Sequence, residues 1–95
     1  MITNFQEVLL SLQSRLEDYL EGQGIATNRK FKCLHPRHED QHPSCVLLPD
    51  KVRFYCHSGA HQGDIFDAAN FLEGRPLDGP GFITETLEPL ARRFG

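Results

Sequence analysis

The chain has 95 residues, of which 39% are hydrophobic, and a net charge of −3 at neutral pH. A chain of this length has a core only just large enough to fold, so we expect a single domain over residues 1–95. Its three cysteines, an odd number, argue against a secreted disulfide framework. No apolar run has the length of a secretory signal or a membrane span, so we expect no membrane contact and a reducing cytoplasm.

The net charge conceals a gradient along the chain. Residues 1–26 and residues 57–95 each carry a net charge of −3, whereas residues 27–56 carry +3. The basic charge therefore lies in the middle of the chain, between two acidic segments that are predicted to be helical.

Residues 1–24 are predicted to form an amphipathic helix. Apolar side chains recur at spacings of three and four between Phe5 and Leu20, as they do on one face of a helix. Thr3 and Gln6 offer a capping box at its start, and two glycines follow its end. The apolar stripe predicts a helix that covers the core.

Residues 27–33 are predicted to form a strand. Lys30 and Lys32 alternate with Phe31, which places the lysines on one face of the strand and the ring, expected in the core, on the other. Residues 34–43 are predicted to be a loop.

Residues 44–48 and 52–56 are predicted to pair as a β-hairpin across a turn at residues 49–50. Phe54 is expected to point into the core.

Asp64 is predicted to cap a helix that Gly74 ends. A Gly- and Pro-rich stretch over residues 75–81 then leads to a last helical segment. Pro89 leaves two possibilities for this segment: it starts near Thr86 with the proline in its first turn, or it begins earlier and bends.

Four residues form two matched pairs, Cys33 with His38 and Cys56 with His61. Four residues separate the members of each pair, and 17 residues lie between the pairs. A structural Zn²⁺ is bound by four nitrogen or sulfur donors in a tetrahedron, and a short chain can supply them as two local pairs. We therefore expect these four residues to hold one zinc ion, with the hairpin between the pairs.

Other residues compete for the zinc ion. His35 and His57 lie too close to a cysteine in the sequence to wrap comfortably around the same ion, although His57 stays open as the fourth ligand. Pro43 discourages the helix in which His42 would serve as a ligand, and Cys45 falls within a strand, where a small thiol usually packs in the core. A catalytic zinc is disfavoured because four ligands close its coordination shell.

The residues around the two pairs resemble the N-terminal zinc-binding domain of bacterial and phage DNA primases of the DnaG type. The resemblance rests on residues 31–33, 38–44, 54–56 and 63–67 and covers about residues 27–95. Two departures from the family pattern are present. The first pair is two residues longer than the family's Cys-x2-His, and the family's final cysteine would fall at Gly59, for which His61 is the expected substitute.

The resemblance implies an α+β domain with a small antiparallel zinc ribbon at residues 27–63, packed against an N-terminal helix at 1–24 and C-terminal helices at 64–95. It implies a module that holds single-stranded template DNA and helps to select primer start sites, without catalysis by this chain. The implied partners are a primase catalytic domain or a replicative helicase, in a bacterial or phage-infected cytoplasm.

The basic middle segment predicts where DNA would bind. Single strands are held by cations along the phosphates and by aromatic rings that stack on bases. The side chains expected to contact DNA are Arg29, Lys30, Lys32, Arg37, Lys51, Arg53 and Tyr55. The alternative is a protein-binding zinc-ribbon adaptor of a phage or mobile element that docks on a replication helicase or polymerase, which the low net basicity favours.

Overall fold

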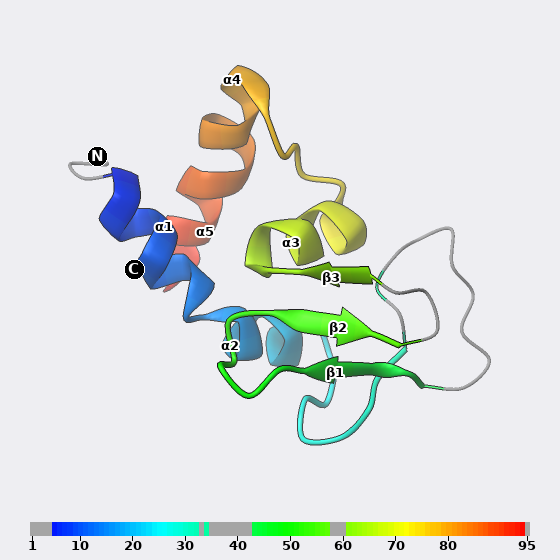
Figure 1. Cartoon of the computed structure of the whole chain (residues 1–95). Coiled ribbons are helices and arrows are strands. Elements are labelled where there is room, and N and C mark those ends of the chain that lie inside the picture. The colour runs from blue at the N-terminus through cyan, green and yellow to red at the C-terminus, as the bar shows by residue number, and fades with distance from the viewer. Residues whose placement is uncertain (1–4, 33, 35–42, 58–60, 95) are drawn as a thin grey trace.

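The computed structural model describes residues 5–32, 34, 43–57 and 61–94, with His61 described through its backbone alone. In chain order the elements are α1 (Phe5–Gln13), α2 (Leu16–Gly22), β1 (Cys45–Leu47), β2 (Phe54–Cys56), β3 (His61–Gly63), α3 (Ile65–Glu73), α4 (Gly79–Gly81), a π-helical stretch η1 (Phe82–Leu87) and α5 (Glu88–Phe94). Figure 1 shows α3 beside β3, and α1, α4 and α5 gathered away from the strands. The predicted α+β class is confirmed.

The N-terminal helix is interrupted, although the sequence predicted one continuous helix over residues 1–24. Ser14 and Arg15 separate α1 from α2. The amide of Arg15 donates to the carbonyl of Leu12 at 2.9 Å, three residues back instead of four. Leu12 and Leu16 are both buried despite the interruption. Apolar spacing alone therefore could not reveal it.

The sheet has the strand order β1-β2-β3, and both neighbouring pairs are antiparallel. β1 and β2 form the predicted hairpin, in which the amide of Leu48 donates to the carbonyl of Arg53 at 2.9 Å. Lys51 has a φ of 60° in the turn, a left-handed conformation that is uncommon outside turns for residues other than glycine. β3 was not predicted, because a three-residue strand that ends in Gly63 carries no alternating pattern.

Within the described residues, the predicted strand at 27–33 is reduced to one antiparallel bridge between Phe31 and Cys45. The amide of Phe31 donates to the carbonyl of Cys45 at 2.9 Å, and the amide of Cys45 donates to the carbonyl of Phe31 at 2.8 Å. The chain bends over residues 27–29, where the sequence predicted extended strand. The predicted alternation is confirmed, because Phe31 is buried whereas Lys30 and Lys32 are exposed.

Asp64 caps α3 as predicted. Its Oδ1 accepts hydrogen bonds from the amides of Phe66 and Asp67 at 2.9 and 3.2 Å, while Oδ2 of Asp67 accepts from the amide of Asp64 at 3.0 Å. These reciprocal bonds form a capping box that satisfies amides left open at the start of a helix. Gly74 ends the helix with a φ of 69°.

Pro89 lies in a helical segment that begins earlier, at α4, and does not start near Thr86. Proline has no amide hydrogen, and its ring collides with the carbonyl four residues back, which is that of Glu85. The π-helical stretch η1 directly precedes α5, and the carbonyl of Glu85 accepts a hydrogen bond from the Arg75 guanidinium at 2.6 Å. The wider turn and the arginine together accommodate the proline.

One hydrophobic core joins the sheet to the helices. Phe54 is buried as predicted, and so is Phe31. The buried hydrophobic side chains of this core are Leu12, Leu16, Tyr19, Leu20, Phe31, Leu34, Cys45, Phe54, Cys56, Ile65, Phe66, Ala68, Ala69, Leu87 and Leu90. The inner side of the sheet is therefore packed, and its outer side is the surface on which a ligand could bind.

Candidate metal centre and nucleic-acid interface

Two of the predicted zinc ligands occupy opposed positions on neighbouring strands. The antiparallel register places Cys56 of β2 opposite His61 of β3. The same register places Cys56 opposite Cys45 of β1, which is itself bridged to Phe31. A single row of backbone positions therefore crosses the sheet from Phe31 to His61.

Cys56 is the one predicted ligand whose side chain the structure describes. It is fully buried, and its Sγ lies 3.4 Å from Oγ of Ser44. Cys45 is also fully buried, which agrees with its predicted place in the core. Cys33 and His38 lie outside the described residues. Among the side chains that are described, no three His, Cys, Asp or Glu residues are grouped so as to hold a metal ion.

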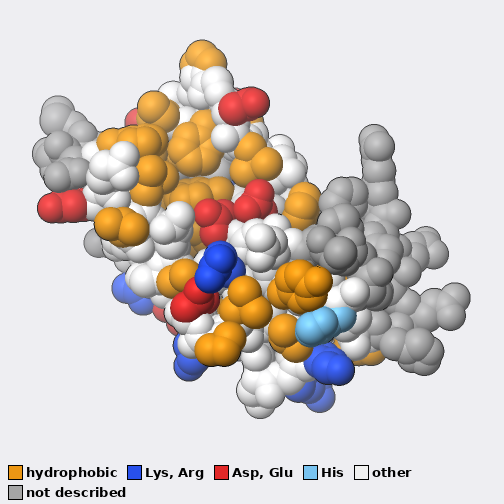
Figure 2. Space-filling model, in the orientation of Figure 1, with side chains coloured by type: hydrophobic (Ala, Val, Ile, Leu, Met, Phe, Trp, Pro, Cys, Tyr) orange, Lys and Arg blue, Asp and Glu red, His pale blue; other side chains and the backbone are white. Residues whose placement is uncertain are grey.

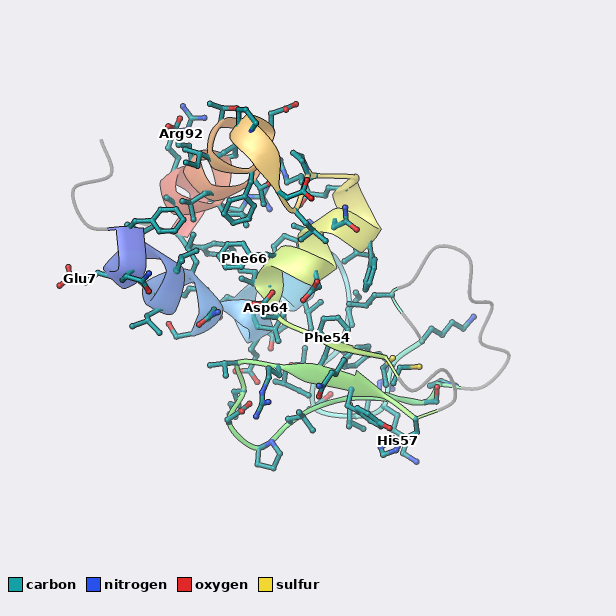
Figure 3. The ribbon with its side chains drawn as sticks, turned by 45° about the horizontal axis from the view of Figure 1, so that its top comes forward. Glu7, Phe54, His57, Asp64, Phe66 and Arg92 are labelled. Carbon is teal, nitrogen blue, oxygen red and sulfur yellow. The ribbon has the colours of Figure 1, made fainter. Side chains whose placement is uncertain are left out.

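His57 lies on the outer side of the sheet, not with Cys56. Its ring packs edge-to-face against Tyr55, with 4.8 Å between the ring centroids and 76° between the ring planes. Its amide donates to the carbonyl of Ser44 at 3.1 Å, which continues the pairing of β1 with β2 by one residue. Figure 3 shows His57 on the side of the sheet opposite to Phe54 and the helices. Sequence reasoning considered His57 only as a ligand and missed this aromatic pair.

The predicted DNA-contacting cations divide into two groups. Arg53 is bonded to Asp50 at 2.9 Å, and Lys51 lies 3.8 Å from the Glu17 carboxylate. The Arg53 side chain, with help from the amide of Val52, lowers the pKa of Asp50. These two cations are therefore partly neutralised.

The second group comprises Arg29, Lys30 and Lys32, which are exposed and have no ion pair within the described part of the chain. Arg37 lies outside the described residues. Figure 2 shows basic side chains next to a histidine and a group of hydrophobic side chains on the viewed face. Basic and aromatic groups therefore share one region of the surface.

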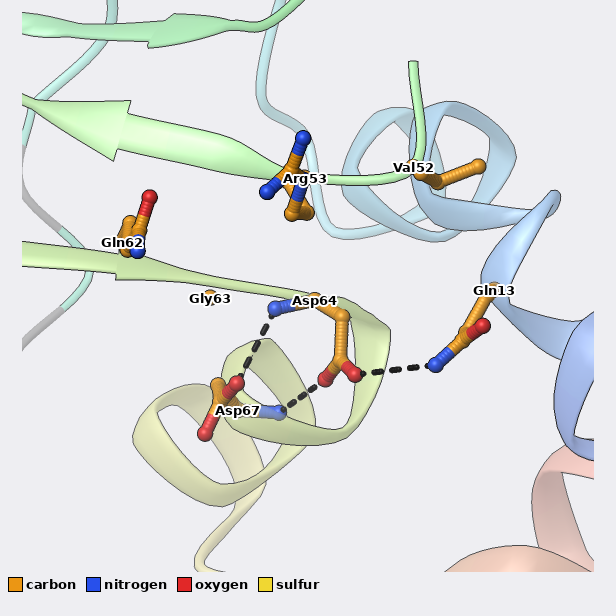
Figure 4. Close-up of a pocket in the computed structure, with 7 residues that line it drawn as sticks. All are labelled: Gln13, Val52, Arg53, Gln62, Gly63, Asp64 and Asp67. Atoms are coloured by element: carbon orange, nitrogen blue, oxygen red, sulfur yellow. Dashed lines mark hydrogen bonds between the residues drawn. The ribbon is translucent and has the colours of Figure 1, made fainter. Parts of the chain in front are cut away.

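A pocket of about 320 Å³ lies where β3 meets α3 (Figure 4). Its polar lining comes from Gln13, Arg53, Gln62, Asp64 and Asp67. Nε2 of Gln13 donates to Oδ2 of Asp64 at 3.3 Å, which ties α1 to the start of α3. Burial raises the pKa of Asp67, and the adjacent Asp64 carboxylate adds to this. Two carboxylates and one guanidinium, that of Arg53, therefore meet at this end of the sheet.

Comparison with protein-family models, with curated proteins and with solved structures finds no match for this chain. Among the described helices, none combines the length and the apolar character that a membrane crossing requires.

Proposed function

We propose that this chain is a zinc-ribbon module that binds single-stranded template DNA for a primase of the DnaG type and helps to select primer start sites. The observation that carries the proposal is the register of β2 and β3, which places Cys56 opposite His61. Opposed residues of an antiparallel pair have Cβ atoms about 4.5–5.5 Å apart, a separation that one metal ion can bridge. Primer synthesis itself would belong to a separate catalytic domain.

The buried Cys56 thiol suits a structural zinc site. A thiolate in an apolar environment is costly unless a cation compensates it, and Zn²⁺ supplies that charge. Cys33 and His38 would complete the set from the segment between the Phe31 bridge and β1. Zinc would then clamp that segment to the β2–β3 pair, which rigidifies the surface next to it.

The outer side of the sheet supplies what a single strand requires. Tyr55 and His57 offer aromatic rings on which bases stack, at about 1–3 kcal/mol per base. Arg29, Lys30 and Lys32 offer positive charge to the phosphates, and no acidic side chain neutralises them within the described residues. Stacking together with phosphate contact favours single strands over duplex DNA, whose bases are already paired.

A protein-binding adaptor is the second candidate. The ion pairs of Lys51 and Arg53 reduce the basic surface, and exposed apolar side chains on the helices, among them Leu10 and Ile83, are available for contact with another protein. Under this alternative the ribbon would dock on a replication helicase or polymerase and would bind no DNA.

Fluorescence anisotropy with a labelled single strand of DNA, measured across a salt series, distinguishes the DNA-binding module from the protein-binding adaptor. For the DNA module, affinity should fall steeply as salt rises, because bound phosphates release counterions. Replacing both Lys30 and Lys32 by alanine should reduce the slope of log K against log salt by about 1.4, since each single-strand phosphate contact contributes about 0.7. Lys51→Ala is the matched control and should change the slope less, because Glu17 already pairs with this lysine. Absence of binding at low salt would leave the adaptor as the better explanation.

A further inference from the structure

The outer side of the sheet is organised in rows that cross the strands. Tyr55 pairs with Val46 of β1 on one side and with Gln62 of β3 on the other. Extending the isolated Phe31–Cys45 bridge by one residue in the same antiparallel register would bring Lys30 opposite Val46. One row therefore contains Lys30, Val46, Tyr55 and Gln62.

A second row lies two residues further along the strands. The bridge at Phe31 places Lys32 opposite Ser44, and the amide of His57 bonds to the carbonyl of Ser44. This row therefore contains Lys32, Ser44 and His57. Each row has an exposed lysine at the β1 side and, on the far side of β1, an aromatic ring from β2 (Tyr55) or from the residue that follows it (His57).

The spacing of these groups matches the repeat of a single strand. Residues two apart on an extended chain are separated by roughly 6.6 Å, so Lys30 and Lys32 lie about as far apart as successive phosphates of an extended strand. Tyr55 and His57 are also two residues apart, and their ring centroids lie 4.8 Å from each other. Neighbouring strands lie about 4.8 Å apart, so the ring-bearing strand is roughly 10 Å from the lysine-bearing segment, which one nucleotide can span from phosphate to base.

The charges on the two sides of the sheet determine the orientation. Lys30 and Lys32 border β1, whereas Asp64 and Asp67 follow β3. Phosphates are attracted to the β1 side, whereas β3 itself carries no lysine or arginine. The bases must then point from the β1 side toward β3, over the two rings.

We infer that this surface binds two consecutive nucleotides of a single strand, one per row, with phosphates on Lys30 and Lys32 and bases stacked on Tyr55 and His57. The inference rests on the proposed function and specifies how the strand is held. The planes of the two rings are 76° apart, so they cannot both belong to one continuous stack of bases. The two bases are therefore separated from each other when bound, and each stacks on its own ring.

Photocrosslinking tests this arrangement in the zinc-loaded full chain. Oligonucleotides of thymidine carry one 5-iodouracil, moved by one position from strand to strand, and the crosslinked residue is identified by mass spectrometry. We expect Tyr55 and His57 to be the main crosslinked residues, at positions one nucleotide apart. His57→Ala should weaken binding about tenfold and keep the bound zinc, whereas His57→Phe should retain the affinity because it keeps a stacking ring.

Binding and crosslinking results can contradict the two-row arrangement without contradicting DNA binding. If no strand binds at low salt, both are wrong. If strands bind and depend on Lys30 and Lys32, but the crosslinks fall elsewhere and His57→Ala binds normally, the two-row arrangement is wrong and the DNA-binding function stands. Gln6→Ala, an exposed change in α1, is the control and should alter neither crosslinks nor affinity.

Discussion

His57 and His61 are competing candidates for the fourth ligand of the proposed zinc site, and the register of the sheet favours His61. His61 lies opposite Cys56, whereas the ring of His57 packs against Tyr55 on the other side of the sheet. We expect His61→Ala to lose both the zinc ion and the fold, because three ligands leave a structural site open. His57→Ala and Cys45→Ser should keep the zinc.

Native mass spectrometry counts the zinc ions in each purified variant, and circular dichroism reports its fold. Zinc retained at full stoichiometry in the His61 variant, together with loss in the His57 variant, would reverse the assignment.

Much of the residue-scale environment was predictable. The alternation around Phe31 and the position of Asp64 before an apolar helix each depend on local sequence, and the structure agrees with both. The pairing of Lys51 with Glu17 was not predictable, because it joins α2 to a turn far along the chain. The Asp50 and Arg53 pair, three residues apart in that turn, could have been suspected from its spacing. The predictions at Cys33, His38 and Arg37 remain predictions.

At the scale of elements, Glu73 joins three helices. Its carboxylate accepts from the Tyr19 hydroxyl of α2 at 2.5 Å and from Arg75 at 3.1 Å, and Arg93 of α5 lies 3.5 Å away. Burial raises the pKa of Glu73, but the hydrogen bonds from these three partners outweigh burial and lower it overall. The folded protein therefore favours the ionised carboxylate.

This network predicts a pH dependence of stability. A carboxyl group with a lower pKa in the folded than in the unfolded chain stabilises the fold above the unfolded pKa, and that contribution is lost as the pH falls through the folded pKa. We expect Glu73→Gln to be less stable than the parent chain at neutral pH. The difference should shrink as the pH falls below about 4, where unfolded glutamates become protonated.

Urea unfolding at several pH values measures this difference. Glu88→Gln is the matched control, because Glu88 has no ion pair within the described residues. Protonation of the proposed zinc ligands would affect the parent chain and both variants alike and would cancel in the comparison. A stability difference for Glu73→Gln that stays constant from neutral to acid pH would show that the carboxylate charge does not stabilise the helices.

The elements were predicted where local signals are strong. The hairpin has a turn between two apolar strands, and α3 has an apolar pattern between Asp64 and Gly74, which cap its two ends. Both elements are confirmed. The interruption at Ser14 and the short β3 were missed, because the first preserves apolar spacing and the second is too short to show any. The π-helical stretch before Pro89 depends on a tertiary hydrogen bond from Arg75, which no local pattern contains.

At the scale of the whole molecule, the sheet is too small to be stable alone. Each of its strands has 3 residues, and strands of that length need packing or a further constraint. The helices cover the inner side of the sheet through Phe54 and Cys56. A metal ion held across Cys56 and His61 would add a further constraint at the other end of the sheet from the turn at Lys51.

Removal of zinc should therefore unfold the ribbon. We expect a strong chelator to release one metal ion per chain and to abolish the β-sheet signal in circular dichroism, because the free energy of metal binding contributes directly to folding. Hydrogen exchange should show lost protection at Val46 and Tyr55 together with loss of DNA binding, since the rows on the outer surface depend on the strand register. Readdition of zinc should restore both, whereas Mg²⁺, which prefers oxygen ligands, should not. Chelated, metal-free protein that keeps full strand protection would show that no metal organises this sheet.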